Sequence, residues 1–367
     1  MKTSNGTQRA FEGILDEYFE GVLEDYPMMA NELGLRVGEG RLGTVGLGFE
    51  KRQEKRRQNT LAALESLAVN ELHAEQHLDR LALRSQLLAE CEDFARGMHG
   101  LEPDGVDAVF GILLHELQRG EDEPARARRN IRGILKSAPT YLSRAANMIQ
   151  RPERVWRRIM NQTVDGAPAM FDALEAFMKK EDARVIASTR RAVSKYRDAV
   201  MNKPAAPRNS FSLGAACLQR RVRDELGLDY TLGQVESLAL SEAKRIGGLL
   251  SAACARHGKG KSAEQIIEEA RAEWNPKGDL LDIYRAETNR VAKGFKKAKA
   301  VSFPKGDELQ VRLVPEFMRH LYPTAAYSSP GPFEKRQRGI FWVNDLSLTK
   351  SSPADQLAEV QQHFGIS

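Results

Sequence analysis

The hydrophobic pattern of this chain changes once, and that change constrains the fold more than any other feature. Before Val311, apolar residues recur mostly every three or four positions, the spacing of helices that bury one face. Between Val314 and Asp345 the apolar runs are short and are separated by prolines and glycines. Val311, Leu313 and the run Ile340–Val343 have the composition and boundaries of strands. The sequence therefore predicts a mainly α fold, a large multi-helical body with a small β-sheet near the C-terminus.

The helical body should consist of successive amphipathic helices joined by short turns. The clearest break is Pro204–Pro207, which predicts an N-terminal helical layer over residues 1–203 and a second helical layer with the small sheet over residues 208–367. The break is short, so we expect a hinge within one fold rather than a flexible linker. The predicted helices are Gln8–Asp25, Pro27–Gly34, two within Glu50–Gly97, Gly105–Gln118, two separated by Pro139, one opened by Pro152, Ala167–Lys179, Ala183–Met201, Leu213–Leu226, Leu232–Ala255, Ala263–Trp274 and Leu280–Lys297.

Composition limits where such a chain can work. Hydrophobic residues make up 41% and charged residues 29%, yet no run approaches the roughly 18 apolar residues that a membrane helix needs. The N-terminal segment lacks the apolar core of a signal peptide. The cysteines Cys91, Cys217 and Cys254 are scattered and odd in number, which indicates neither a disulfide framework nor a metal cluster. We therefore expect a cytoplasmic protein with no membrane partner.

Basic residues gather in one part of a chain whose formal net charge is +5. We interpret them as the solvated faces of several helices, because runs of charge commonly mark such faces. Nucleic-acid binding is the alternative, and we rank it last because only Tyr141 and Trp156 are available there for base stacking. The residues are Arg126, Arg128, Arg129, Arg132, Lys136, Arg144, Arg151, Arg154, Arg157 and Arg158.

Two short stretches come close to a zinc motif without completing it. His73 and His77 share one helical face, but Glu75 lies midway between them rather than beside the first histidine, and the face offers no third ligand. His115-Glu116 is followed by Arg119 where a second histidine would be needed, and a guanidinium cannot bind zinc. The residues themselves therefore predict no catalytic group, no metal ligand and no cofactor in this chain.

Three stretches of the chain together carry a recognisable pattern. They are Phe11–Pro27 with Glu32–Leu35, then Phe211–Gly214 with Leu226–Leu228, and finally Pro315–Phe317, Ala326–Tyr327, Pro330–Gly331 and Gly339–Asn344. Together they resemble a known family, the bacterial domain of unknown function numbered 885. The resemblance covers nearly the whole chain, and that family is similar to helical zinc metallopeptidases of the gluzincin type.

The resemblance implies which part of an enzyme this chain corresponds to. Family members continue into a helix with a His-Glu-x-x-Pro-Gly-His-His-like motif, whereas this chain ends at Ser367, about where that helix should begin. We therefore expect the front part of a helical metallopeptidase, its scaffold and substrate side, inactive alone. Zinc is expected only if the C-terminal part is present.

The substrate side is what the resemblance assigns to residues of this chain. Gly339–Val343 would be an edge strand on which an extended peptide pairs. Tyr327 and Asn344 match positions near the family's cleft, where a phenol or an amide could orient a peptide carbonyl. Trp342 joins them as a third candidate substrate-binding residue. The simpler interpretation is that the aromatic residues form the core of a small sheet.

Partners follow from these hypotheses. The first implies a peptide substrate, and either a complementing chain with the zinc motif or self-association through an exposed apolar groove. The alternative is a non-catalytic helical protein-interaction module that retains the same fold.

Overall fold

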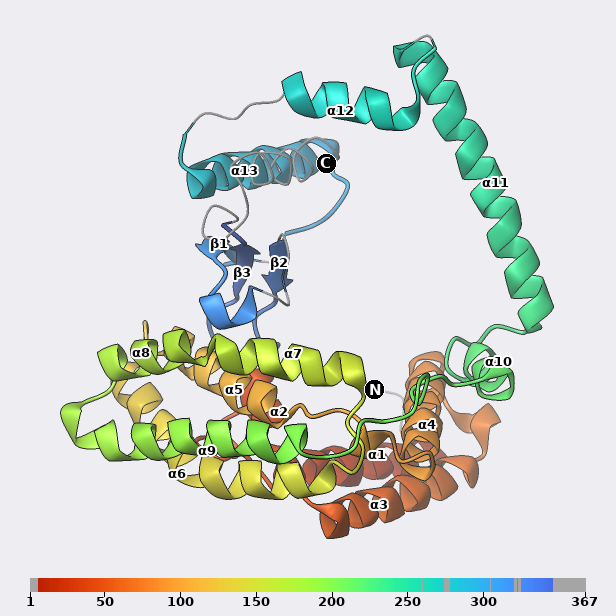
Figure 1. The fold of residues 1–367 in the computed structure, drawn as a ribbon. Coiled ribbons are helices and arrows are strands. Elements are labelled where there is room, and N and C mark those ends of the chain that lie inside the picture. Colours follow the sequence, from red (N-terminus) through yellow and green to blue (C-terminus); the bar gives the residue numbers. More distant parts are fainter. Residues whose placement is uncertain are drawn as a thin grey trace. The chain divides into compact units, whose positions relative to one another are not determined.

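The computed structural model describes residues 6–258, 260–273, 278–303, 305–319, 322 and 325–345. It confirms a mainly α chain with a small sheet near the C-terminus. Contacts cluster into two compact units, 1–230 and 231–367, which are described separately (Figure 1). The predicted division at Pro204–Pro207 into two helical layers stays a prediction. The Pro204–Pro207 segment is tied to unit 1, because the Ala206 N–H donates to the Pro152 carbonyl at 3.0 Å.

The described residues of unit 1 form helices joined by turns and loops. Most helices begin and end within a turn of their predicted bounds, since the apolar stripes that mark them are local features of the sequence. The elements are α1 (Gly6–Asp25), α2 (Pro27–Glu32), α3 (Leu47–Glu65), η1 (Val69–Glu71), α4 (Ala74–Ala95), η2 (Met98–Gly100), α5 (Gly105–Arg119), α6 (Pro124–Met148), α7 (Arg154–Asp165), α8 (Ala167–Phe177), η3 (Lys180–Asp182), α9 (Ala183–Met201) and α10 (Ala215–Asp224).

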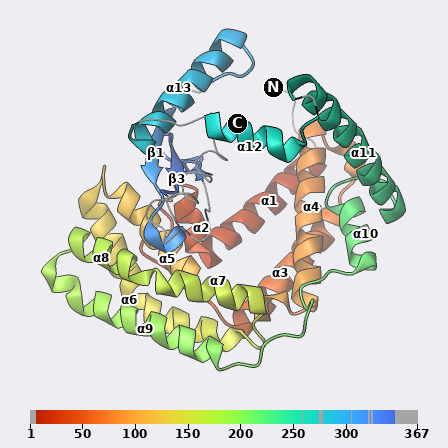
Figure 2. The same ribbon diagram turned by 45° about the horizontal axis from the view of Figure 1, so that its top comes forward.

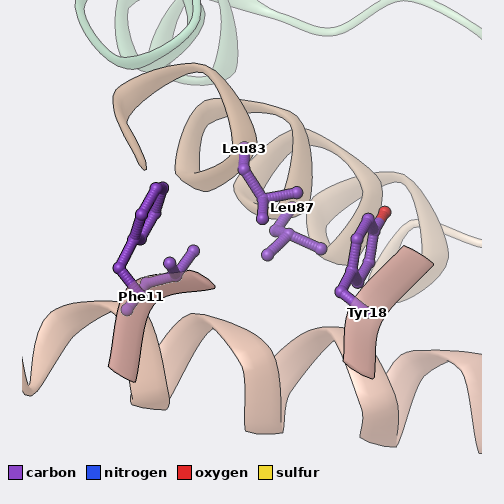
Figure 3. Packing of buried hydrophobic residues seen from close by; sticks show 5 residues of the cluster. Phe11, Tyr18, Leu83 and Leu87 are labelled. Carbon is purple, nitrogen blue, oxygen red and sulfur yellow. The ribbon is translucent and has the colours of Figure 1, made fainter. Parts of the chain in front are cut away.

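The N-terminal helices share one apolar cluster. Phe11 and Tyr18 lie two turns apart on α1, so both side chains leave the same face of the helix. They pack against Leu83 and Leu87 of α4 (Figure 3), and Leu64 of α3 completes the cluster. Because these contacts join segments from α1, α3 and α4, they fix the start of unit 1 as a packed layer rather than a set of independent helices.

Pro139 does not separate two helices, and this prediction was wrong. Helix α6 runs without interruption from Pro124 to Met148 and carries Pro139 in its interior. A proline removes the N–H that would bond to the carbonyl four residues earlier, here Leu135. That buried carbonyl instead accepts a hydrogen bond from the Thr189 hydroxyl of α9 at 3.0 Å. Helix α9 lies alongside α6 (Figure 2), so a tertiary contact supplies the donor that the helix lost.

The described residues of unit 2 form three α-helices, one short 3-10 helix and a three-stranded sheet. The sheet order is β1-β3-β2, with β1 parallel and β2 antiparallel to the central β3. The prediction that Gly339–Val343 is an edge strand is therefore wrong, since β3 has a neighbour on both sides. The elements are α11 (Leu232–His257), α12 (Ala263–Glu273), α13 (Leu280–Ala298), β1 (Glu308–Leu313), η4 (Glu316–Met318), β2 (Ala325–Ser328) and β3 (Arg338–Val343).

The sheet buries apolar residues on both faces. On one face Val311 and Val343 pack with Tyr284 of α13, and burial raises the pKa of that tyrosine to about 12. On the other face Ile340 and Trp342 pack with Val314. Successive residues of β3 point to opposite faces, so the stretch Ile340–Val343 is apolar throughout rather than alternating. The central strand β3 is thus held by packing on both of its faces, and β1 and β2 pair with it.

Candidate functional site

The three candidate substrate-binding residues all lie in or beside the sheet, but the structure does not bring them together. Tyr327 faces Phe341 across the β2–β3 pair, whereas Ala326 faces Trp342. Strand alternation therefore puts Tyr327 and Trp342 on opposite faces of the sheet. Asn344 comes directly after β3, two residues beyond Trp342. Their substrate roles stay predictions, and their surroundings differ.

Trp342 is a core residue. Only 3% of its surface is exposed, and it packs with Val314 and Ile340. Its indole N–H donates to the Ser328 hydroxyl of β2 at 2.8 Å, which satisfies the one polar atom that burial would otherwise strand. This side-chain hydrogen bond links β2 to β3 in addition to the backbone hydrogen bonds between the two strands.

Asn344 holds the loop that precedes β2. It is 5% exposed, and its amide nitrogen donates to the Tyr322 carbonyl at 2.9 Å and to the Arg319 carbonyl at 3.4 Å. Those carbonyls follow the short η4 turn, so the side chain links the end of β3 to the chain that leads into β2. A positioning role fits these contacts.

Tyr327 is the exposed member of the three. Its side chain is 57% exposed on edge strand β2, and its ring lies over Gly339 of β3. A Cβ at Gly339 would come within 2.4 Å of the tyrosine hydroxyl oxygen, so the ring can lie flat there only because residue 339 is glycine. An aromatic ring over a cross-strand glycine covers the backbone that the missing side chain would leave bare. The result is an exposed tyrosine on β2 whose ring leans toward the central strand.

A charged cluster at the start of β1 was not predicted from the sequence. The Glu308 carboxylate accepts a hydrogen bond from Gln310 at 2.8 Å and pairs with Arg336 at 2.7 Å and with Arg338 at 3.4 Å. The Gln310 hydrogen bond, followed by that from Arg336, lowers the pKa of Glu308. The cluster joins β1 to the chain entering β3, so it fixes the parallel pair at one end.

The near-miss zinc motif of α5 turns out to be a buried structural network. Glu116 is fully buried, and its carboxylate accepts hydrogen bonds from Asn31 of α2 at 2.7 Å, Arg119 at 2.7 Å and Asn130 of α6 at 3.2 Å. A second Arg119 nitrogen lies 2.9 Å from the His115 ring. These side chains therefore bind one another and join α2, α5 and α6.

The other histidine pair has a local role as well. His73 precedes α4 as its N-cap, and its Nδ1 accepts from the Gln76 N–H at 3.3 Å. Among the described residues, no group of three or more His, Cys, Asp or Glu is arranged to hold a metal ion.

Several of the clustered basic residues are committed to contacts within unit 1. Arg128 donates to the Phe177 carbonyl at 2.9 Å, Arg132 pairs with Asp182 at 2.5 Å, and Arg157 donates to the Met201 carbonyl at 2.7 Å. Arg126 pairs with Glu39 and Glu123. Four of the ten clustered basic residues therefore contribute to contacts within unit 1, and the interpretation of the stretch stays a prediction.

Comparisons with known proteins place the fold in a family without assigning an activity. The family described as "Bacterial protein of unknown function (DUF885)" matches residues 27–365. One similar solved structure is "a putative lipoprotein of unknown function" from Shewanella oneidensis, at 15% identity and a TM-score of 0.67, covering 96% of this chain and 67% of that one. Another is "the putative lipoprotein" from Colwellia psychrerythraea, at 12% identity and 0.64, covering 98% and 71%. No curated protein matches.

One further finding concerns membranes. Among the described helices, none combines the length and the apolar character that a membrane-spanning segment requires.

Proposed function

The chain belongs to the DUF885 family of bacterial proteins of unknown function, and from that premise we propose that it forms the substrate side of a peptide-bond hydrolase. The proposal rests on the resemblance of its motifs to helical zinc metallopeptidases and on one structural observation. That observation is the edge strand β2, which presents an exposed Tyr327 beside a central strand anchored on both faces.

An extended peptide would add to the sheet along β2. Binding of this kind takes its affinity from backbone hydrogen bonds and its specificity from side chains next to the edge. Among the described residues, β2 pairs with β3 alone, so its second edge has no strand beside it. At the other end of the sheet, β1 packs with α13 and begins in the Glu308 cluster. We therefore assign the peptide to β2.

The three candidate residues take different parts in this proposal. Tyr327 contacts the peptide, with its phenol available as a donor or an acceptor. Trp342 and Asn344 are positioning residues that hold β2 through Ser328 and through the Arg319 and Tyr322 carbonyls.

Replacing Tyr327 by alanine should weaken peptide binding by about tenfold, the usual order for losing an aromatic contact at the centre of an interface. The probe is a fluorescein-labelled pentapeptide of alternating valine and threonine, and the measurement is fluorescence anisotropy. Phe295→Ala is the matched control, since Phe295 is an exposed aromatic residue on α13. The control should bind like the parent protein.

Backbone pairing has its own test. The same peptide with N-methyl groups at alternate residues cannot donate along the edge, so it should lose most of its affinity for the parent protein. If the methylated peptide binds as well as the unmodified one, or if neither binds at millimolar concentrations, the edge-strand proposal is wrong.

The proposal assigns no zinc ligand to residues 1–367, because the sequence contains no His-Glu-x-x-His. We expect the purified 367-residue chain to contain far less than one zinc per chain by elemental analysis and to leave a quenched-fluorophore peptide uncleaved. Stoichiometric zinc together with hydrolysis that a chelator abolishes would contradict the assignment.

The cytoplasm is the location that we propose, on the ground of the cysteine usage. The lipoprotein names of the two solved neighbours point elsewhere. Cell fractionation followed by mass spectrometry for an N-terminal lipid decides between the two.

Helix α11 favours the second candidate function, a non-catalytic interaction module. Five of its large apolar residues are half exposed or more, and none of its residues is buried. In a two-fold dimer the same surface of both subunits meets, so α11 of one copy would bury its apolar residues against α11 of the other. We therefore take a second copy of this chain as the partner. The exposed residues are Leu238, Leu240, Ile246, Leu249 and Leu250.

Light scattering after size exclusion tests this candidate. We expect a dimer that the double change Ile246→Glu and Leu250→Glu converts to a monomer, while Leu309→Glu, an exposed apolar position on β1, does not. A parent protein that stays monomeric at high concentration excludes the interaction module in this form.

A further inference from the structure

A groove between α6 and α9 of unit 1 has the chemistry of an anion-binding site. Its volume is about 390 Å³, within the range of small-molecule pockets. Of the residues that line it, two are basic and none is acidic. It is independent of the sheet and of the proposed peptide site, because every lining residue belongs to unit 1.

Arg191 and Lys195 form the charged wall. They lie one turn apart on α9, and both are exposed. Like charges at this spacing repel each other along a helix. Within the described part of the chain, neither side chain has an ion-pair partner. Asp198, one turn beyond Lys195, lies instead 4.0 Å from Arg197.

Other arginines on the same helix show the contrast. Arg190 pairs with Glu175 at 2.8 Å and lies over the Phe171 ring, with 4.8 Å between the guanidinium carbon and the ring centre. Arg197 pairs with Asp165 at 3.4 Å. Arginines on the other sides of α9 therefore have acidic partners on neighbouring helices. The two basic residues on the groove side have no acidic partner among the described residues.

Neutral donors and an apolar wall complete the groove. Ser143 and Asn147 line it from α6, and Ser188 lines it from α9, so hydroxyl and amide donors accompany the two cations. The Tyr196 ring is a fixed wall, because its hydroxyl oxygen accepts a hydrogen bond from the buried Gly105 N–H at 3.1 Å. Alanines such as Ala199 leave the space between these groups open.

We propose that this groove binds a small organic anion, with its carboxylate or phosphate group between Arg191 and Lys195 and its apolar part against the alanines and the Tyr196 ring. A bidentate contact to Arg191 and a point-charge contact to Lys195 are the interactions that such groups make with these two side chains.

The test is a titration of the full chain, followed by backbone amide NMR shifts, with four probes at constant ionic strength. The probes are inorganic phosphate, phenyl phosphate, acetate and butyrate. We expect saturable shifts at Ser188, Arg191 and Lys195, with the probe that carries the apolar group binding several-fold tighter than its parent anion. Saturation by the phosphates or by the carboxylates identifies the class. Linear shifts with all four probes overturn the proposal.

Matched variants separate a site from general surface charge. The double change Arg191→Met and Lys195→Met should lower the affinity by at least about tenfold, the effect of losing charge-assisted hydrogen bonds. Ala199→Leu should lower it while leaving both charges, because the added side chain occupies the groove. Arg197→Met removes a positive charge from the same helix outside the groove and should change nothing. Equal losses in Arg197→Met and in the double variant would refute the site.

Discussion

Replacing Glu116 by alanine should cost about 3–5 kcal/mol in the free energy of unfolding of unit 1, the usual penalty for leaving a buried charge without its partner. The carboxylate is fully buried and accepts from Asn31, Arg119 and Asn130. Its removal takes one anionic partner from the Arg119 guanidinium, whose side chain is only 8% exposed, and leaves that group its hydrogen bonds to Asn31. Urea unfolding followed by far-UV circular dichroism measures the loss.

Two controls define what the Glu116 result means. Glu116→Gln keeps an acceptor in place and should cost less than the alanine change. Glu65→Ala breaks a surface pair with Arg84 at 3.1 Å and should cost no more than about 1 kcal/mol. Because the chain has two compact units, hydrogen exchange at α5 and α6 amides identifies the transition that belongs to unit 1. Equal costs for Glu116→Ala and Glu65→Ala would mean that the buried network contributes nothing.

The same network shows where sequence reasoning stops. The spacing of His115, Glu116 and Arg119 predicts no zinc motif, because the face lacks a second imidazole. The spacing does not reveal what the glutamate binds instead. Asn31 lies 85 residues away in the chain and meets Glu116 only after α2 packs on α5. Local patterns predict helices, whereas the partners of a buried charge depend on tertiary packing.

The sheet contains strands that local sequence patterns predict and one strand that they do not. Val311 and Leu313 in β1 and the apolar run Ile340–Val343 in β3 have β-type residues bounded by turns, so strands were predictable there. Strand β2 was missed because Ala325-Ala-Tyr-Ser328 is short and half alanine, a residue depleted in strands. Missing β2 also placed β3 at the edge, since strand order depends on pairing across many residues. Tyr327 was identified as a candidate, but its place on an edge strand over Gly339 required the structure.

Pro139 and Thr189 form a compensating pair that can be tested by a double-mutant cycle. Thr189 is fully buried, and Thr189→Val keeps its shape while removing the hydroxyl that donates to the Leu135 carbonyl. The same hydroxyl lies 3.1 Å from the Val185 carbonyl, but that carbonyl is inside α9, where a backbone N–H serves it. Stranding the Leu135 carbonyl should therefore cost about 1–3 kcal/mol in the free energy of unfolding.

The second substitution of the cycle restores the missing hydrogen-bond donor within α6 itself. Pro139→Ala returns a backbone N–H to α6 at the position that bonds to Leu135 in an ordinary helix. In the Pro139→Ala background, Thr189→Val should cost well under half of what it costs in the parent protein, as measured by urea unfolding. Equal costs in the two backgrounds would show that the Thr189 hydroxyl does not replace the proline's absent N–H. A coupling of the expected sign would explain why a proline in mid-helix leaves α6 continuous, because α9 carries the hydrogen bond that α6 cannot make.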